Sequence, residues 1–125
     1  MHRNADALSA RLDFIGLDQP ARESLRGIAP IIRDALDGAL DRFYDKVRQT
    51  PETVRFFSNP DHMRAAKSRQ DGHWQSIVSG DFGPAYEKNV KAIGSVHARI
   101  GLEPRWYIGG YALILEELIT AIVMK

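Results

Sequence analysis

Four histidines are the side chains of this sequence best suited to bind a metal or to transfer a proton near neutral pH. They are His2, His62, His73 and His97. The sequence contains no H-E-x-x-H, so the helical two-histidine zinc motif is missing. His62 and His73 are eleven residues apart, which on one helix corresponds to about 16 Å along the axis. We therefore interpret these two as partly exposed helix histidines that do not share a metal ion.

His97 differs because it falls on the apolar stripe of a predicted helix. This stripe, with steps of three or four residues, consists of Tyr86, Val90, Ile93, His97 and Ile100. We therefore expect His97 at a core position, where an imidazole must be neutral or paired and each ring nitrogen needs a partner. Two interpretations follow from the residues alone. His97 is either a core histidine bonded to a backbone carbonyl or an axial ligand of a metal cofactor.

Tyr44, Gln70 and a set of aromatic residues could line a flat pocket. Tyr44 follows Phe43 at the edge of an earlier apolar stripe, and Gln70 lies one helical turn from Ala66 and Trp74. Without any ligand, Tyr44 is explained as a packing residue on a buried helix face, and Gln70 as a glutamine that is exposed or hydrogen-bonded. The aromatic residues that suit either a core or the walls of a pocket are Phe56, Phe57, Trp74, Phe82, Trp106 and Tyr107.

Helices are predicted to carry all of these residues. An apolar stripe of helical period runs from Leu25 to Val47. Asp18 is suited to cap its first turn, because Asp is a favoured N-cap residue and a proline follows two positions later. Pro30 lies inside the stripe and should break or kink it, since proline has no N–H to donate. We expect two helices, or one bent helix, ending near Gln49.

Prolines and glycines predict the remaining helix boundaries. Prolines at positions 51, 60, 84 and 104 mark helix starts, and Gly80 and Gly101 mark helix ends. No four-to-eight-residue alternation typical of a strand occurs. The predicted fold class is therefore all-α, with six to eight helices and an N-terminal extension helix within residues 1–17.

Composition indicates one soluble domain covering residues 1–125. Hydrophobic residues make up 44% and charged residues 26% of the 125 positions. Lys and Arg number 17 against 16 Asp and Glu, so nothing points to a nucleic-acid partner. The absence of cysteine excludes disulfides, thiolate metal sites and covalent haem attachment.

The ends of the sequence lack the features of targeting or membrane segments. The N-terminus is polar and mixed in charge, unlike a signal peptide. The most apolar segment, residues 106–124, has Glu116 and Glu117 at its centre, which disfavours a membrane span. We expect a cytoplasmic protein. Because the last predicted helix is apolar on most of its circumference, we also expect it to meet a partner chain and the natural protein to continue beyond it.

The segment from Ile93 to Tyr111 resembles the proximal-helix segment of the globin-coupled sensors. In that family the pattern H-x-R-I-G-L-x-P-x-W-Y carries the haem-binding histidine, and here it runs from His97 to Tyr107. Phe43-Tyr44 together with residues 51–53 resembles the family's distal tyrosine segment. Gln70 with His73-Trp74 resembles its distal helix. The similarity covers residues 25–124 and is greatest to the globin domains of chemotaxis transducers.

This resemblance implies a sensor globin fold around a non-covalent b-type haem. It assigns His97 as the proximal iron ligand and Tyr44 as the distal donor of a hydrogen bond to bound dioxygen. Gln70 matches a second polar distal group, and Tyr107 matches a tyrosine near the proximal histidine. The residues thereby expected to contact the cofactor are Phe43, Tyr44, Phe57, Ala66, Arg69, Gln70, Trp74, Val96, His97 and Tyr107. Of these, Ala66 and Arg69 depart from the apolar or small hydroxyl residues that relatives often have there.

The resemblance also implies an oxygen sensor rather than an enzyme. Dioxygen would be the ligand, with carbon monoxide and nitric oxide as further ligands, and the last two helices would form a homodimer contact. The expected output domain, beyond this chain, is a chemotaxis transducer, with a diguanylate cyclase as the alternative. A globin with nitric oxide dioxygenase or peroxidase-like activity, and a haem-free signalling module, are the competing interpretations.

Overall fold

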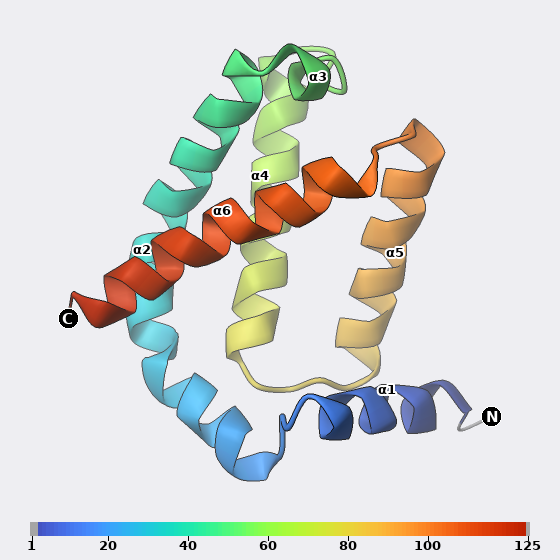
Figure 1. Ribbon diagram of the computed structural model, residues 1–125, viewed down its shortest axis with the longest axis vertical. Coiled ribbons are helices and arrows are strands. Elements are labelled where there is room, and N and C mark those ends of the chain that lie inside the picture. Colours follow the sequence, from blue (N-terminus) through green and yellow to red (C-terminus); the bar gives the residue numbers. More distant parts are fainter. Residues whose placement is uncertain (1–2, 125) are drawn as a thin grey trace.

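Six helices follow one another along the chain in the computed structural model, which describes residues 3–124. No strand occurs between these residues, so the prediction of an all-α fold is confirmed. The helices are α1 (Arg3–Phe14), α2 (Gln19–Gln49), α3 (Pro51–Val54), α4 (Pro60–Val78), α5 (Pro84–Ile100) and α6 (Pro104–Val123) (Figure 1).

Local capping chemistry sets the helix boundaries where the sequence predicts them. The Asp18 side chain accepts a hydrogen bond from the Ala21 amide at 3.0 Å, and Asn59 accepts one from the His62 amide at 2.8 Å. Four helices begin at a proline, which has no N–H to leave unpaired. Gly80 and Gly101 follow helix ends with φ of +71° and +75°, the left-handed region that glycine adopts without strain.

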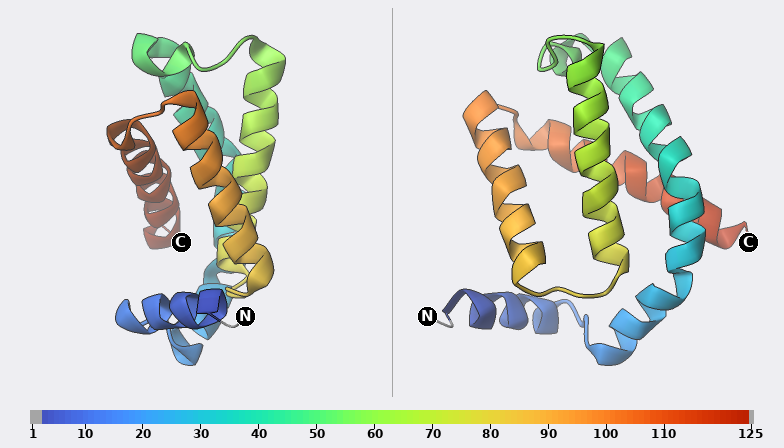
Figure 2. Two further views of the ribbon diagram at one scale, coloured as in Figure 1. Left: turned by 90° about the vertical axis from the view of Figure 1, so that its right-hand side faces the viewer. Right: turned by 180° about the vertical axis from the view of Figure 1, so that it is seen from behind.

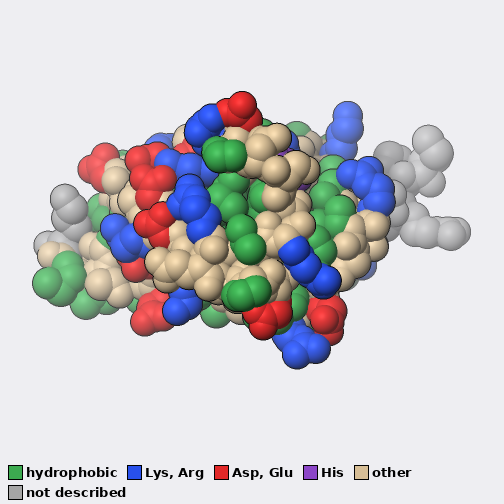
Figure 3. All heavy atoms as spheres, turned by 90° about the horizontal axis from the view of Figure 1, so that it is seen from above, with side chains coloured by type: hydrophobic (Ala, Val, Ile, Leu, Met, Phe, Trp, Pro, Cys, Tyr) green, Lys and Arg blue, Asp and Glu red, His purple; other side chains and the backbone are tan. Residues whose placement is uncertain are grey.

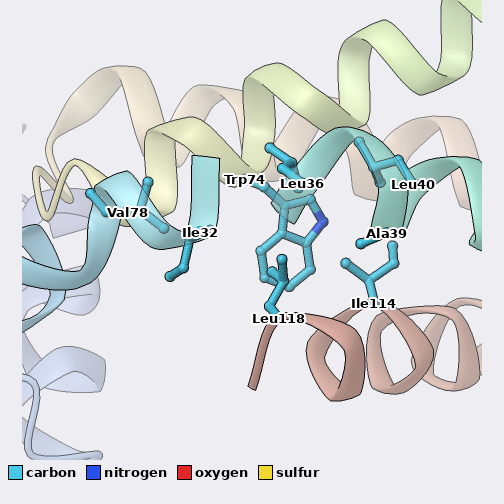
Figure 4. Close-up of a cluster of buried hydrophobic side chains, with 9 residues drawn as sticks. Ile32, Leu36, Ala39, Leu40, Trp74, Val78, Ile114 and Leu118 are labelled. Carbon is cyan, nitrogen blue, oxygen red and sulfur yellow. The ribbon is translucent and has the colours of Figure 1, made fainter. Parts of the chain in front are cut away.

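Helix α2 is the longest element and forms the spine of the fold. It continues through Pro30 as one bent helix (Figure 1), which confirms the second of the two predicted alternatives. Helices α4 and α6 both pack against α2, and α6 crosses it (Figure 2). The buried core between the three helices consists of Ala29, Ile32, Leu36, Ala39, Leu40, Trp74, Val78, Ile114 and Leu118 (Figure 4).

Polar contacts tie α4 and α6 to α2 at the edges of this core. Lys67 Nζ lies 2.7 Å from carboxylate oxygens of both Asp37 and Asp41. Arg42 pairs with Glu117 at 2.6 Å. Exposed pairs of this kind add little to stability, so they fix the register of the helices more than they hold them together. From the α3 end, side chains of both charges surround a strip of apolar ones (Figure 3).

Helices α5 and α6 leave apolar side chains uncovered. None of the α5 side chains is buried, although the helix has an apolar stripe. On α6, Ile114 and Leu118 are buried, whereas Ile108 is 61% and Ile119 50% exposed. Helix α6 alone among the described helices is long and apolar enough to cross a membrane. Its packing against α2 accounts for one apolar face, and its other face is exposed.

Gly110 allows the close approach of α6 to α2. A Cβ atom at this position would lie 3.0 Å from Cε1 of Phe43, whereas one at Gly109 would meet nothing within 4 Å. Alanine favours a helix over glycine by about 1 kcal/mol, but crowding a packed contact costs about 1–3 kcal/mol. We therefore expect Gly109→Ala to be at least as stable as the wild type and Gly110→Ala to be less stable than Gly109→Ala by about 1–2 kcal/mol. Urea unfolding followed by circular dichroism measures both, and equal stabilities would contradict this account.

Candidate functional site

His97 and Tyr107 form a stacked pair where α5 passes into α6. Their ring centroids are 4.9 Å apart with 16° between the planes. A short turn makes this possible, because Gly101 adopts a left-handed conformation and the Leu102 amide donates to the His97 carbonyl at 3.0 Å. Tyr107 follows the predicted helix start at Pro104 by three residues. The structure thus brings together the two residues that the resemblance placed on one side of the cofactor.

The imidazole of His97 is half-buried rather than fully buried. The expectation of a core position was therefore wrong, because the other described helices cover only part of the apolar stripe of α5. Burial still lowers the pKa of His97 below its usual value of 6.5. The neutral imidazole, which is the form that binds a metal, is thereby favoured at neutral pH.

Tyr44 lies on α2, in a cluster formed by residues of α2, α3 and α4. It is 4% exposed and packs with Val47 and Met63. The edge of Phe43 meets its ring at a centroid distance of 4.8 Å, and Phe57 does so at 6.1 Å. Ala66 packs against the same cluster.

The surroundings of Tyr44 keep its phenol protonated. Burial raises the pKa of Tyr44 to about 12; the charge of Arg69 opposes this rise and the Tyr111 hydroxyl adds to it. Both Arg69 and Tyr111 therefore lie near the phenol. The protonated phenol is a hydrogen-bond donor that can offer its O–H to a ligand.

The face of α4 next to this cluster carries buried polar atoms. Gln70 is half-buried, and its Oε1 is sealed from solvent without a hydrogen-bond partner among the described residues. The same holds for Nδ1 of His73 and Nε1 of Trp74. The expectation that His73 is partly exposed was wrong, since it is 7% exposed beneath Tyr86 and Tyr111. His62 is exposed, and its Nδ1 accepts a hydrogen bond from the Ser58 amide at 3.1 Å.

Other predicted site residues lie at the margins of the site. Val96 is 40% exposed, and Arg69 is exposed near Tyr44. Trp74 belongs to the core between α2, α4 and α6. No aromatic contact joins the His97–Tyr107 pair to the Tyr44 cluster within residues 3–124. His2 lies outside the described residues.

Sequence reasoning missed Tyr111, which stands one turn after Tyr107 on α6. Its ring meets the rings of His73 and Trp74 edge-on, at centroid distances of 6.3 Å and 5.7 Å. Burial raises the pKa of Tyr111 above its usual value of 10. The four-residue spacing from Tyr107 was the signal that could have identified it.

These residues fit a flat, largely apolar cofactor that takes one imidazole as a ligand. Helix α5 offers His97 within an apolar stripe of which Val90 and Ile100 are each 41% exposed. Helices α2 and α4 offer the Tyr44 cluster and the buried polar atoms of Gln70 and His73. A haem group requires this combination of an axial histidine, apolar walls and a few polar distal groups.

Alkaline titration tests the environment of Tyr44. With a pKa near 12 against about 10 in an unfolded chain, Tyr44 holds its proton in the folded state while the unfolded state releases it. The corresponding stability is complete below pH 10 and is lost as pH rises toward 12. Absorbance at the phenolate band should show late titration of Tyr44 as well as of Tyr111, and in Tyr44→Phe its amplitude should fall by one tyrosine. If the amplitude of the late step is unchanged in that variant, the assignment to Tyr44 is wrong.

Comparison with known proteins agrees with this arrangement. The protoglobin family matches residues 4–125. A related protein, the heme-based aerotactic transducer HemAT of Halobacterium salinarum, is 26% identical over 113 residues, which cover 90% of this chain. The match spans 23% of that relative's length. The family match extends over nearly the whole sequence, and the chain therefore belongs to the protoglobin family.

Proposed function

We propose that this chain is a haem-binding sensor domain that binds dioxygen reversibly and signals through α6. The observation that carries the proposal is the two-sided site. A neutral imidazole stacked on Tyr107 lies on α5, and a buried, protonated phenol lies on α2. The relative whose name describes a heme-based aerotactic transducer supports the same function.

His97 would hold the haem as its axial ligand, and the cofactor would be the non-covalent b-type because the sequence has no cysteine. When bound, ferrous haem supplies a site for dioxygen, carbon monoxide or nitric oxide and shifts electron density onto dioxygen far more than onto carbon monoxide. Phe43, Phe57 and Ala66 exclude water from the distal side. Tyr107 orients the imidazole through their stacked contact.

Tyr44 would make the site selective for dioxygen. Its hydroxyl can donate a hydrogen bond to a partly negative oxygen, and a bond to a charged acceptor contributes about 1–3 kcal/mol. Its high pKa keeps the donor proton in place at every physiological pH. Gln70, one turn of α4 beyond Ala66, would supply a second hydrogen-bonding group.

Signalling would use the short connection between His97 and α6. A displacement of the imidazole acts on Tyr107 directly and on Pro104 through the turn at Gly101. The exposed apolar face of α6 would form a homodimer contact, and ligand binding would favour one of two dimer states according to its affinity for each. The output domain, located in the cytoplasm, would be a chemotaxis transducer; a diguanylate cyclase is the alternative.

Replacement of His97 tests haem ligation. His97→Ala should fold but lose its haem or hold it weakly, because the sole protein bond to iron is removed. Added imidazole should restore the Soret absorption in part. His62→Ala, which changes an exposed histidine, should leave the spectrum unchanged. An unchanged haem spectrum in His97→Ala would contradict the assignment and transfer the role to His62 or His73.

Replacement of Tyr44 tests oxygen selectivity. Tyr44→Phe removes the donor and keeps the ring, so dioxygen should be released about five to a hundred times faster. Carbon monoxide binding should change much less. The double variant Tyr44→Phe with Gln70→Leu should release dioxygen faster than Tyr44→Phe alone, because Gln70 can partly replace the lost donor in the single variant. Stopped-flow release and rebinding on the ferrous forms measure these rates, and equal effects on both gases would mean that Tyr44 only fills space.

A further inference from the structure

One turn of α4 carries three buried polar atoms that have no hydrogen-bond partner among the described residues. They are Oε1 of Gln70, Nδ1 of His73 and Nε1 of Trp74. His73 and Trp74 are each 7% exposed. Side chains at positions i, i+3 and i+4 of a helix are neighbours. Buried polar atoms in native proteins nearly always have a partner, often an ordered water, and these three atoms lie at neighbouring positions of one helix face, where one partner can serve them all.

Aromatic rings from α5 and α6 enclose this turn. The His73 imidazole is stacked on Tyr86 with a centroid distance of 6.3 Å and 14° between the planes. Tyr111 meets the edges of both His73 and Trp74. The indole nitrogen of Trp74 lies on the side of Leu40 and away from Val78 (Figure 4). Because Val78 follows Trp74 on α4, this nitrogen is turned toward the half of the helix that carries Gln70.

The donor and acceptor types of the three atoms select a neutral ligand that can both donate and accept. An indole nitrogen only donates, and an amide oxygen only accepts. An anion would be repelled by the amide oxygen, and a cation would be repelled by the indole N–H. A neutral imidazole nitrogen accepts or donates according to its tautomer. Water satisfies all three atoms in either tautomer, and three partners is the usual number for a buried water.

We propose that one water molecule binds between Gln70, His73 and Trp74 on α4, accepting from the indole and donating to the amide oxygen. The consequence for the ligand rests on the proposed function. With Oε1 tied to the water, the Gln70 amide presents only its N–H groups to a bound gas. His73 and Trp74 are then positioning residues that make Gln70 a donor rather than an acceptor.

The indole N–H of Trp74 reports this water directly. The chain has two tryptophans, so protein labelled with ¹⁵N-tryptophan gives two indole signals and Trp106 serves as the internal control. Measured on the purified protein after reduction with dithionite and addition of carbon monoxide, so that any haem is ferrous and diamagnetic, Trp74 should show a cross-peak to a bound water. In Gln70→Leu and in His73→Phe the cross-peak should vanish, and the indole N–H should exchange about tenfold faster.

A matched variant controls for the removal of a glutamine from α4. Gln75→Leu changes an exposed glutamine on the same helix and should leave both indole signals unchanged. If the Trp74 indole signal changes in Gln70→Leu but not in His73→Phe, the shared water is ruled out in favour of a direct hydrogen bond from the indole to the Gln70 amide. If His73→Phe fails to fold, the wild-type protein tests the proposal. The absence of a cross-peak between the Trp74 indole and a bound water then overturns it.

A second readout separates the positioning role from the proposed function. The C–O stretching band of the carbon monoxide complex responds to the group that faces the ligand. Trp74→Phe should shift or split this band in the wild-type background and leave it unchanged in the Gln70→Leu background. An equal shift in both backgrounds overturns the positioning role. A protein without a Soret band would refute the haem proposal alone, because the indole measurement does not depend on haem.

Discussion

The burial of α2 between α4 and α6 is the interaction on which the rest of the structure depends. Leu36, Leu40 and Ile114 are at most 1% exposed, and their burial is the main source of stability for a chain of this size. The same packing sets the positions of both sides of the site. Tyr44 is fixed because it belongs to α2, and Tyr107 is fixed because it belongs to α6. Helix α5 takes its place through His97 and Tyr86, whose rings stack on residues of α6 and α4.

The site combines a well-packed side with a sparsely packed one. Tyr44 and its aromatic neighbours form a dense cluster on α2, α3 and α4, whereas α5 contacts the remaining described residues mainly through a few aromatic rings. Segments with few buried contacts open and shift at low free-energy cost. This asymmetry suits the proposed sensor, in which the ligand-selecting side would stay rigid while the side bearing His97 would move.

Local signals explain how much of the fold could be predicted. Asp18, Asn59 and the helix-starting prolines act on adjacent backbone groups, so the sequence alone placed the helix boundaries correctly. Tyr107 could be paired with His97 because only the short loop at Gly101 separates α5 from α6. The burial of His73 and the role of Tyr111 could not be predicted, since they depend on how α4, α5 and α6 meet in space. The incomplete burial of His97 also escaped prediction, because helical period identifies an apolar face but not the element that covers it.

The central claim is that haem covers the apolar face of α5, and hydrogen exchange measured during haem addition tests it most directly. One equivalent of haem added to the haem-free protein should give a Soret band and slow amide exchange in residues 84–100 far more than in the α2 core. The same addition to His97→Ala should produce little of this protection. Protection of α2 and α5 to the same degree, or a chain that takes up no haem, would contradict the account.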